Sequence, residues 1–189
     1  MRKMTYFTLF FVFIASMLTG CSNSSEEAIK NTDRKVLEKI PVESTRDIEE
    51  YLAGKGYTVL SSPVKVETYK LGKSMLIDFP DQSIWGLQDC EPSDCIGKDI
   101  ELYKCKVKDH PLDSYKGNIN HRTNSWVMVC ENNIIGGYSF PDFDDAPPEL
   151  VPVGGCYSLD GRTLEEVTGI DFQEWREKWV KKYSNNDKG

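Results

Sequence analysis

Residues 126–140 read WVMVCENNIIGGYSF, and this stretch decides the fold. It places two apolar runs, 126–130 and 134–140, on either side of Asn132-Asn133. Asparagine tolerates the positive φ that a tight turn between two strands requires. The stretch therefore predicts a β-hairpin, the clearest one in the chain.

A further strand is predicted just before the hairpin. Ile100 and Leu102 are apolar at even positions, and Tyr103, Cys105 and Val107 then alternate with lysines at odd ones. Alternation with a period of two is typical of a strand with one buried face. Because the apolar set changes from even to odd near Leu102, we expect a β-bulge there, with a misassigned strand end as the alternative.

Helices are predicted at both ends of the strand region. Ser44 or Thr45 can cap a helix that stops at Gly54. Near the C-terminus, residues 163–166 form a capping box, and Asp171 caps a second helix. That helix carries four aromatic residues at helical spacing, which we interpret as core residues. They are Phe172, Trp175, Trp179 and Tyr183.

The segments between these elements are shorter. Strands are predicted at 57–60, 64–71 and 84–87, with one helical turn within 74–79. The sum is an α+β fold: an N-terminal helix, one curved antiparallel sheet of about five strands with helix on its inner face, and a C-terminal helical segment.

The first 21 residues, MRKMTYFTLFFVFIASMLTGC, contain a basic start and an uncharged apolar run from Tyr6 to Leu18. The run is shorter than the ~20 apolar residues of a spanning helix, which leaves an uncleaved anchor as the weaker interpretation. Leu18-Thr19-Gly20-Cys21 resembles the lipobox of bacterial lipoprotein signal peptides. The resemblance implies cleavage before Cys21, and a diacylglycerol thioether and further acylation, such as palmitate, on that residue.

The predicted organisation has four parts. Residues 1–20 are the signal peptide, 21–43 a polar flexible tether, 44–183 a single α+β domain, and 184–189 a disordered tail. Loss of the leader removes two basic residues and no acid, which changes the net charge from −7 to −9. An acidic chain argues against a nucleic-acid partner and against a polybasic supplement to the lipid.

Five cysteines remain once Cys21 carries the lipid. An exported protein permits disulfides, but connectivity does not follow from the sequence. Cys90 and Cys95 flank a turn and are the candidate disulfide, with ordinary free thiols as the alternative. Within the strand patterns, Cys105 and Cys130 are interpreted as small core residues. The five are Cys90, Cys95, Cys105, Cys130 and Cys156.

No catalytic or metal-binding constellation is recognisable. His110 and His121 match no zinc spacing and are interpreted as exposed loop residues. Asp142 to Glu149 is the densest run of acids, but Pro147-Pro148 interrupts it and the glycine of an EF-hand loop is missing. We interpret it as a solvated acidic loop, with calcium binding as the alternative, and predict no metal, cofactor or catalytic residue.

A second resemblance lies near the C-terminus. Residues 157–169, YSLDGRTLEEVTG, the following Trp175 and the Gly-Gly-Tyr-Ser of 136–139 are similar to uncharacterised Gram-positive lipoproteins. This resemblance covers most of residues 44–183 and implies no activity.

The sequence therefore predicts a lipid-anchored extracytoplasmic protein on the outer face of the cell membrane. The favoured function is a non-enzymatic binding module for a cell-envelope protein or ligand. Its expected contact surface consists of two loops, 110–123 and 141–155, because function tends to lie on loops carried by a rigid sheet. The alternatives are a structural envelope component and an extracytoplasmic hydrolase or thiol-redox enzyme that uses Cys90 and Cys95 or His110.

Overall fold

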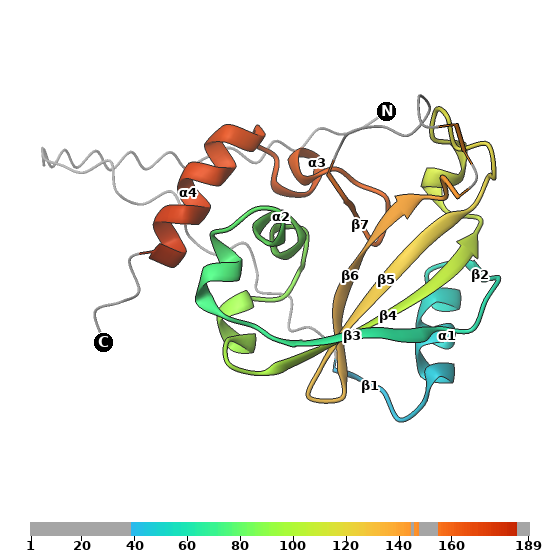
Figure 1. The fold of residues 1–189 in the computed structure, drawn as a ribbon, viewed down its shortest axis with the longest axis horizontal. Helices are drawn as coiled ribbons and strands as arrows, with labels where there is room; N and C mark the ends of the chain where they lie inside the picture. The colour runs from blue at the N-terminus through green and yellow to red at the C-terminus, as the bar shows by residue number, and fades with distance from the viewer. Residues whose placement is uncertain (1–38, 145, 148–154, 185–189) are drawn as a thin grey trace, which may run out of the picture. The chain divides into compact units, whose positions relative to one another are not determined.

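The computed structural model describes residues 39–144, 146–147 and 155–184. It confirms the α+β class, with a short N-terminal helix, a curled antiparallel sheet and a C-terminal helix (Figure 1). The elements are β1 (Ile40–Pro41), α1 (Thr45–Gly54), β2 (Thr58–Val59), β3 (Val64–Lys70), η1 (Lys73–Leu76), α2 (Asp81–Gly86), η2 (Pro92–Cys95), β4 (Asp99–Lys108), η3 (Pro111–Ser114), β5 (Thr123–Cys130), β6 (Asn133–Pro141), β7 (Tyr157–Ser158), α3 (Leu164–Thr168) and α4 (Phe172–Ser184).

Within these described residues the sheet order is β1-β6-β5-β4-β2, with β3 also paired to β4 and β7 to β6. The predicted hairpin is confirmed as β5 and β6. Its turn lies one residue earlier than expected, because Glu131 and Asn132 take the positive φ values of 49° and 57°. Two consecutive residues with positive φ are typical of the two-residue hairpin turn whose twist matches that of the flanking strands.

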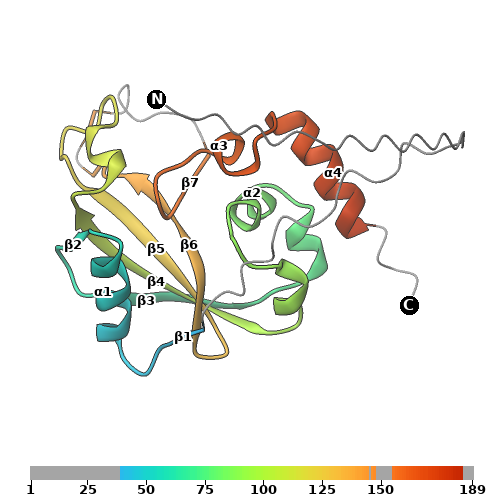
Figure 2. The same cartoon turned by 180° about the vertical axis from the view of Figure 1, so that it is seen from behind.

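Both faces of the sheet are buried, whereas the sequence predicted helix on one face only. Ile100 and Leu102 of β4 belong to a core cluster with Trp85 of α2, while Val107 belongs to a second cluster with Leu52 of α1. Figures 1 and 2, seen from opposite sides, show α1 on one side of the sheet and α2 and α4 on the other.

This arrangement corrects the bulge predicted in β4. Its pairing with β5 is unbroken from Ile100 to Val107, so even and odd side chains keep to opposite faces throughout. The buried apolar residues of β4 change from even to odd positions because each core covers a different end of the strand, on opposite faces. A bulge does occur opposite this point, but in β3, where Val66 is the extra residue between Lys65 and Glu67.

The helix caps follow the sequence. Ser44 caps α1, and Asp47 at its third position completes the capping box. Thr163 and Glu166 form the predicted box on α3, which ends at Gly169 with a left-handed φ of 74°. The Asp171 carboxylate accepts hydrogen bonds from two main-chain amides at the start of α4. These bonds satisfy amide groups that a helix start leaves unpaired.

The aromatic stripe of α4 is confirmed as core at two of its positions. Trp175 and Tyr183 are buried, Trp179 is half-buried and Phe172 is exposed. The indole of Trp179 donates a hydrogen bond of 2.5 Å to the Leu76 oxygen in η1. The strand predicted at 84–87 is wrong, because residues 81–86 form α2, whose Trp85 fills the space beneath α4.

Gly86 allows this close packing, and we expect Gly86→Ala to lower the free energy of unfolding by about 2 kcal/mol through overpacking. A Cβ at Gly86 would overlap the Trp175 ring and lie 3.0 Å from Leu164. Gly54→Ala in α1 is the matched control, since among the described residues no heavy atom lies within 4 Å of its added Cβ. Urea unfolding of both variants checks this, and equal shifts in midpoint would contradict the packing argument.

The folded part begins earlier than predicted. Ile40 and Pro41, placed in the tether by sequence, pair with Ile134 and Asn133 at the edge of β6. The amide of Val42 adds a hydrogen bond of 2.8 Å to the Asn132 oxygen. A short apolar segment is therefore held by the open edge beside the hairpin turn. The predicted signal peptide, tether residues 21–38 including Cys21, and residues 185–189 of the predicted tail lie outside the described residues, while Ser184 belongs to α4 and not to the tail.

Candidate functional site

Two loops meet at one end of the sheet. The first connects β4 to β5 over residues 109–122, and the second begins at Asp142 after β6. Because the three strands are antiparallel neighbours, the end of β4, the start of β5 and the end of β6 lie side by side at the same end of the sheet (Figure 1). The structure thus brings together the described parts of the two loops that the sequence predicted as a contact surface.

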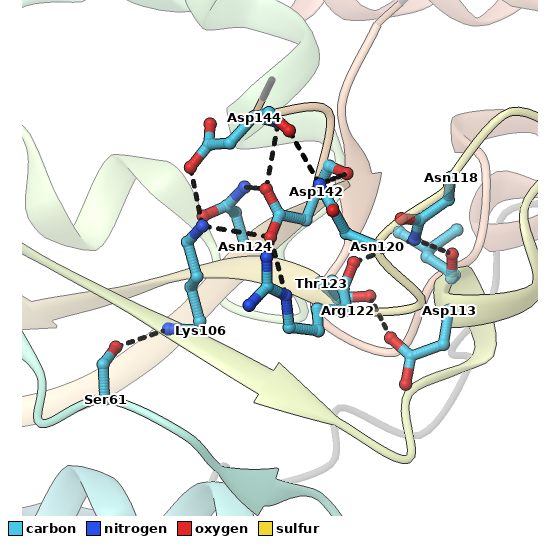
Figure 3. A network of polar contacts seen from close by, with 11 residues as sticks. Ser61, Lys106, Asp113, Asn118, Asn120, Arg122, Thr123, Asn124, Asp142 and Asp144 are labelled. Atoms are coloured by element: carbon cyan, nitrogen blue, oxygen red, sulfur yellow. Dashed lines mark hydrogen bonds and ion pairs between the residues drawn. The ribbon is translucent and has the colours of Figure 1, made fainter. Parts of the chain in front are cut away.

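Asp142 joins the loops. Its side chain is fully buried, and its Oδ2 lies 3.0 Å from Lys106 Nζ and 3.1 Å from Arg122 Nε. Oδ1 accepts hydrogen bonds from the amide nitrogens of Asp144 at 3.1 Å and of the Asn124 side chain at 3.4 Å. Figure 3 shows these groups converging on the carboxylate. A buried carboxylate requires such partners, so the interpretation of Asp142 as part of a solvated loop is wrong.

Lys106 extends the network to the exposed rim. Its ammonium group also donates a hydrogen bond of 2.6 Å to Asp144 Oδ2. This bond lowers the pKa of the Asp144 carboxyl and raises the pKa of Lys106, because each charge favours the other. The main-chain amide of Lys106 donates a hydrogen bond of 2.9 Å to the Ser61 hydroxyl. This bond connects the segment between β2 and β3 to the network around Asp142.

Asparagine side chains fix the backbone of both loops. Asn120 Nδ2 donates to the main-chain oxygens of Asp142 and Asp144, at 3.1 and 2.8 Å. Asn118 Nδ2 donates to the oxygens of Leu112 and Arg122, each at 2.8 Å. The loops are therefore held in shape by polar contacts that satisfy their own main chain.

The two histidines behave differently. His121 is exposed as predicted, but His110 is buried, which corrects the interpretation of both as exposed. Its Nδ1 accepts from the Leu112 amide at 3.1 Å, and its Nε2 lies 3.0 Å from the Leu159 oxygen. Burial lowers the pKa of His110. With both ring nitrogens bonded to main chain, a neutral imidazole caps η3 here and is poorly placed to act as a base.

Aromatic rings support the surface of the loops. Tyr115 makes edge contacts with Phe143 and Tyr157, at centroid distances of 6.2 and 5.7 Å. Ile119, in the same loop, is 51% exposed. We call the outward surface of residues 111–122 and 143–144 the loop platform. An apolar and aromatic centre with a polar rim is the usual anatomy of a protein interface.

A second aromatic group was missed by sequence reasoning. Trp126 stacks on Tyr138 at 5.4 Å, Phe140 packs edge-on against both rings, and Lys104 Nζ lies 4.9 Å from the Trp126 centroid. The register pairs Trp126 with Tyr138 across β5 and β6. Tyr138 and Phe140 are two residues apart in β6 and therefore share a face. Trp126 joins them only because the extra residue Ile135 shifts the register between β5 and β6.

The cysteines also divide between the two faces. Cys105 is buried against α1, while Cys130 is buried with Cys95 and packed by half-buried Cys90 in the opposite core. The burial predicted for Cys105 and Cys130 is confirmed. Cys90 and Cys95 are free thiols in this structure, so the candidate bridge stays a prediction.

A cavity of about 300 Å³ opens between α2, α3 and the start of α4. Its mouth carries Phe79 and Phe172, and most of its wall is apolar. Among the polar wall residues, Thr163 is already used to cap α3, and within the described residues the Ser83 hydroxyl has no hydrogen-bond partner. Such a lining suits an apolar group better than acid–base chemistry.

The described residues contain neither a metal-binding cluster nor a membrane-spanning helix. No group of three or more His, Cys, Asp or Glu side chains is placed to hold a metal ion there. Asp142 and Asp144, the described acids of the candidate calcium loop, instead face Lys106 and Arg122. In the same residues no helix combines the length and apolar character needed to cross a bilayer.

Comparison of the chain with protein-family models, with curated proteins and with solved structures gives no match.

Proposed function

We propose that this chain is a lipid-anchored extracytoplasmic protein that acts as a non-enzymatic binding module on the outer face of the cell membrane. Cys21 carries the lipid, and the polar residues after it form the tether. Treated as a flexible coil of ~5–6 Å times the square root of its length, a tether of roughly 20 residues holds the domain on the order of 25 Å from the lipid.

The observation that carries the binding role is the loop platform. Its two loops are fixed to each other through buried Asp142, and they carry exposed Ile119 and the paired rings of Tyr115 and Phe143. A preorganised surface of this kind loses little conformational freedom when it binds, which favours affinity. The partner is a cell-envelope protein or ligand that covers an apolar patch with a mixed-charge rim.

Ile119→Asp is expected to weaken this binding by at least 10-fold, because a charge at the centre of an interface loses its hydration without gaining a partner. The measurement is chemical crosslinking on intact cells that produce the full chain, followed by quantification of crosslinked species.

Val66→Asp on β3 is the matched control. Val66 is 50% exposed, close to the 51% of Ile119, but it lies outside the loop platform. We expect its crosslinks to match those of the wild type. Equal loss in both variants, or crosslinks unchanged in Ile119→Asp, would contradict a role for the loop platform. Absence of any crosslinked species from wild-type cells would count against the binding module itself.

A further inference from the structure

Three thiols from two parts of the chain belong to one core cluster. Cys90 precedes η2, Cys95 is its last residue, and the Lys98 amide donates a hydrogen bond of 3.0 Å to the Cys95 oxygen as the chain enters β4. Two residues later Ile100 pairs with Cys130 of β5. Turn geometry and strand register together therefore bring Cys130 to the pair that the sequence had singled out.

Cys95 is the central thiol of the three. Its thiol responds to both of the others, because Cys90 raises the pKa of Cys95 and Cys130 lowers it. All three belong to the same core cluster, whereas Cys105 packs in the cluster on the other face of the sheet. A disulfide requires close sulfur atoms, and Cys95 is the thiol that interacts with both of the others.

The three thiols differ in access. Cys95 and Cys130 are each only 5% exposed, while Cys90 is half-buried. The hydrogen bond to Cys90 raises the pKa of Cys95, and burial raises the pKa of Cys130 to about 12. The thiolate is the reactive form, so the two buried thiols are slow to react with solutes, and Cys90 is the point of entry. The Lys98 charge lies near both buried thiols and favours their thiolates when they react.

We propose that Cys90, Cys95 and Cys130 form a thiol–disulfide exchange site in which Cys95 is bridged to either neighbour. This proposal goes beyond the binding role and does not depend on it. The reactant is a disulfide, RS–SR, of the kind met in the oxidising environment outside the cell.

The chemistry proceeds by successive displacements at sulfur. The Cys90 thiolate attacks RS–SR, forms Cys90–SR and releases RS⁻. Cys95 then gives up its proton and attacks the Cys90 sulfur, which forms the Cys90–Cys95 bridge and releases a second RS⁻. Two protein thiols are thereby oxidised and one external disulfide is reduced to two thiols.

The third thiol permits exchange without further oxidation. Cys130 loses its proton and attacks the Cys95 sulfur, so that the Cys95–Cys130 bond forms and the Cys90–Cys95 bond breaks. The released Cys90 thiolate takes up a proton, and no net redox change occurs. The result is a buried bridge beneath a regenerated, accessible Cys90.

The test uses the full lipid-bearing chain in detergent, treated with oxidised glutathione, quenched with acid at intervals and alkylated. A Cys156→Ser background removes the second cysteine from the tryptic peptide that contains Cys130. Trypsin leaves Cys90 and Cys95 together in residues 74–98, and Cys130 in residues 123–162. The two bridges therefore give different products, an internally bridged peptide and a pair of joined peptides.

We expect the Cys90–Cys95 bridge to form first and the Cys95–Cys130 bridge to appear at its expense. Cys90→Ser is expected to slow oxidation at least 10-fold, and Cys130→Ser to leave only the first bridge. Cys105→Ser, on the opposite face, is the control and is expected to change nothing. Circular dichroism verifies that each variant is folded. A glutathione adduct that persists on Cys90, or a first bridge that never exchanges in the Cys156→Ser protein, would overturn the proposal.

Discussion

Asp142→Ala is expected to lower the free energy of unfolding by about 3 kcal/mol, because breaking a buried ion pair leaves charges without compensation. The carboxylate is fully buried, while its partners Lys106 and Arg122 keep 26% and 40% of their side chains exposed. Water can therefore reach the two cations after the substitution, which places the effect at the lower end of the range for buried pairs.

Asp99→Ala is the matched control for this substitution. Asp99 also pairs with a lysine, Lys70, but at 3.6 Å and with about two thirds of each side chain exposed. Exposed pairs of this kind contribute ~0–1 kcal/mol. Urea unfolding monitored by tryptophan fluorescence compares the two variants. An Asp142→Ala protein as stable as Asp99→Ala would contradict the role of Asp142 as the link between the loops.

Elements governed by local chemistry were predictable from the sequence. The β5–β6 hairpin, the caps at Ser44, Thr163 and Asp171, and the stop at Gly169 all depend on residues within a few positions of each other. Their hydrogen bonds close within one turn, so residue type and spacing decide them.

Elements governed by distant contacts were not predictable in the same way. Residues 84–87 are apolar over too short a run to distinguish strand from helix, and contact between Trp85 and the core beneath α4 decides for helix. From the sequence, the change from even to odd apolar positions in β4 was interpreted as a bulge or a misassigned strand end, whereas the structure has an unbroken strand between two cores. Only the packing of α1 and α2 on opposite faces explains the change.

The candidate site shows the same division. Loop positions were predictable from their polar composition, but the burial of Asp142 depends on Lys106, 36 residues earlier in the chain. His110 is buried against Leu159, which is 49 residues away in the sequence and whose main-chain oxygen contacts the imidazole. Cys130 joins Cys95 only through strand register. No local pattern in the sequence marks any of these three contacts.

Cys21→Ser is expected to move the protein from the membrane fraction to the soluble fraction or to leave an unprocessed precursor. In the proposed modification the Cys21 thiol forms a thioether with diacylglycerol, and a serine hydroxyl does not replace it. Each buried methylene contributes ~0.8 kcal/mol to membrane binding, and stable anchoring requires more than one chain. If Cys21 carries two acyl chains as proposed, their loss removes the anchor. Cys156→Ser is the matched control and should keep the wild-type distribution.

The most direct test of the lipid-anchored account is metabolic labelling with palmitate, combined with intact mass measurement of the purified chain. The account predicts a labelled wild-type protein that begins at Cys21 and carries diacylglycerol, and an unlabelled Cys21→Ser protein. Label retained in Cys21→Ser, or a wild-type protein that keeps Met1 and carries no lipid, would contradict it.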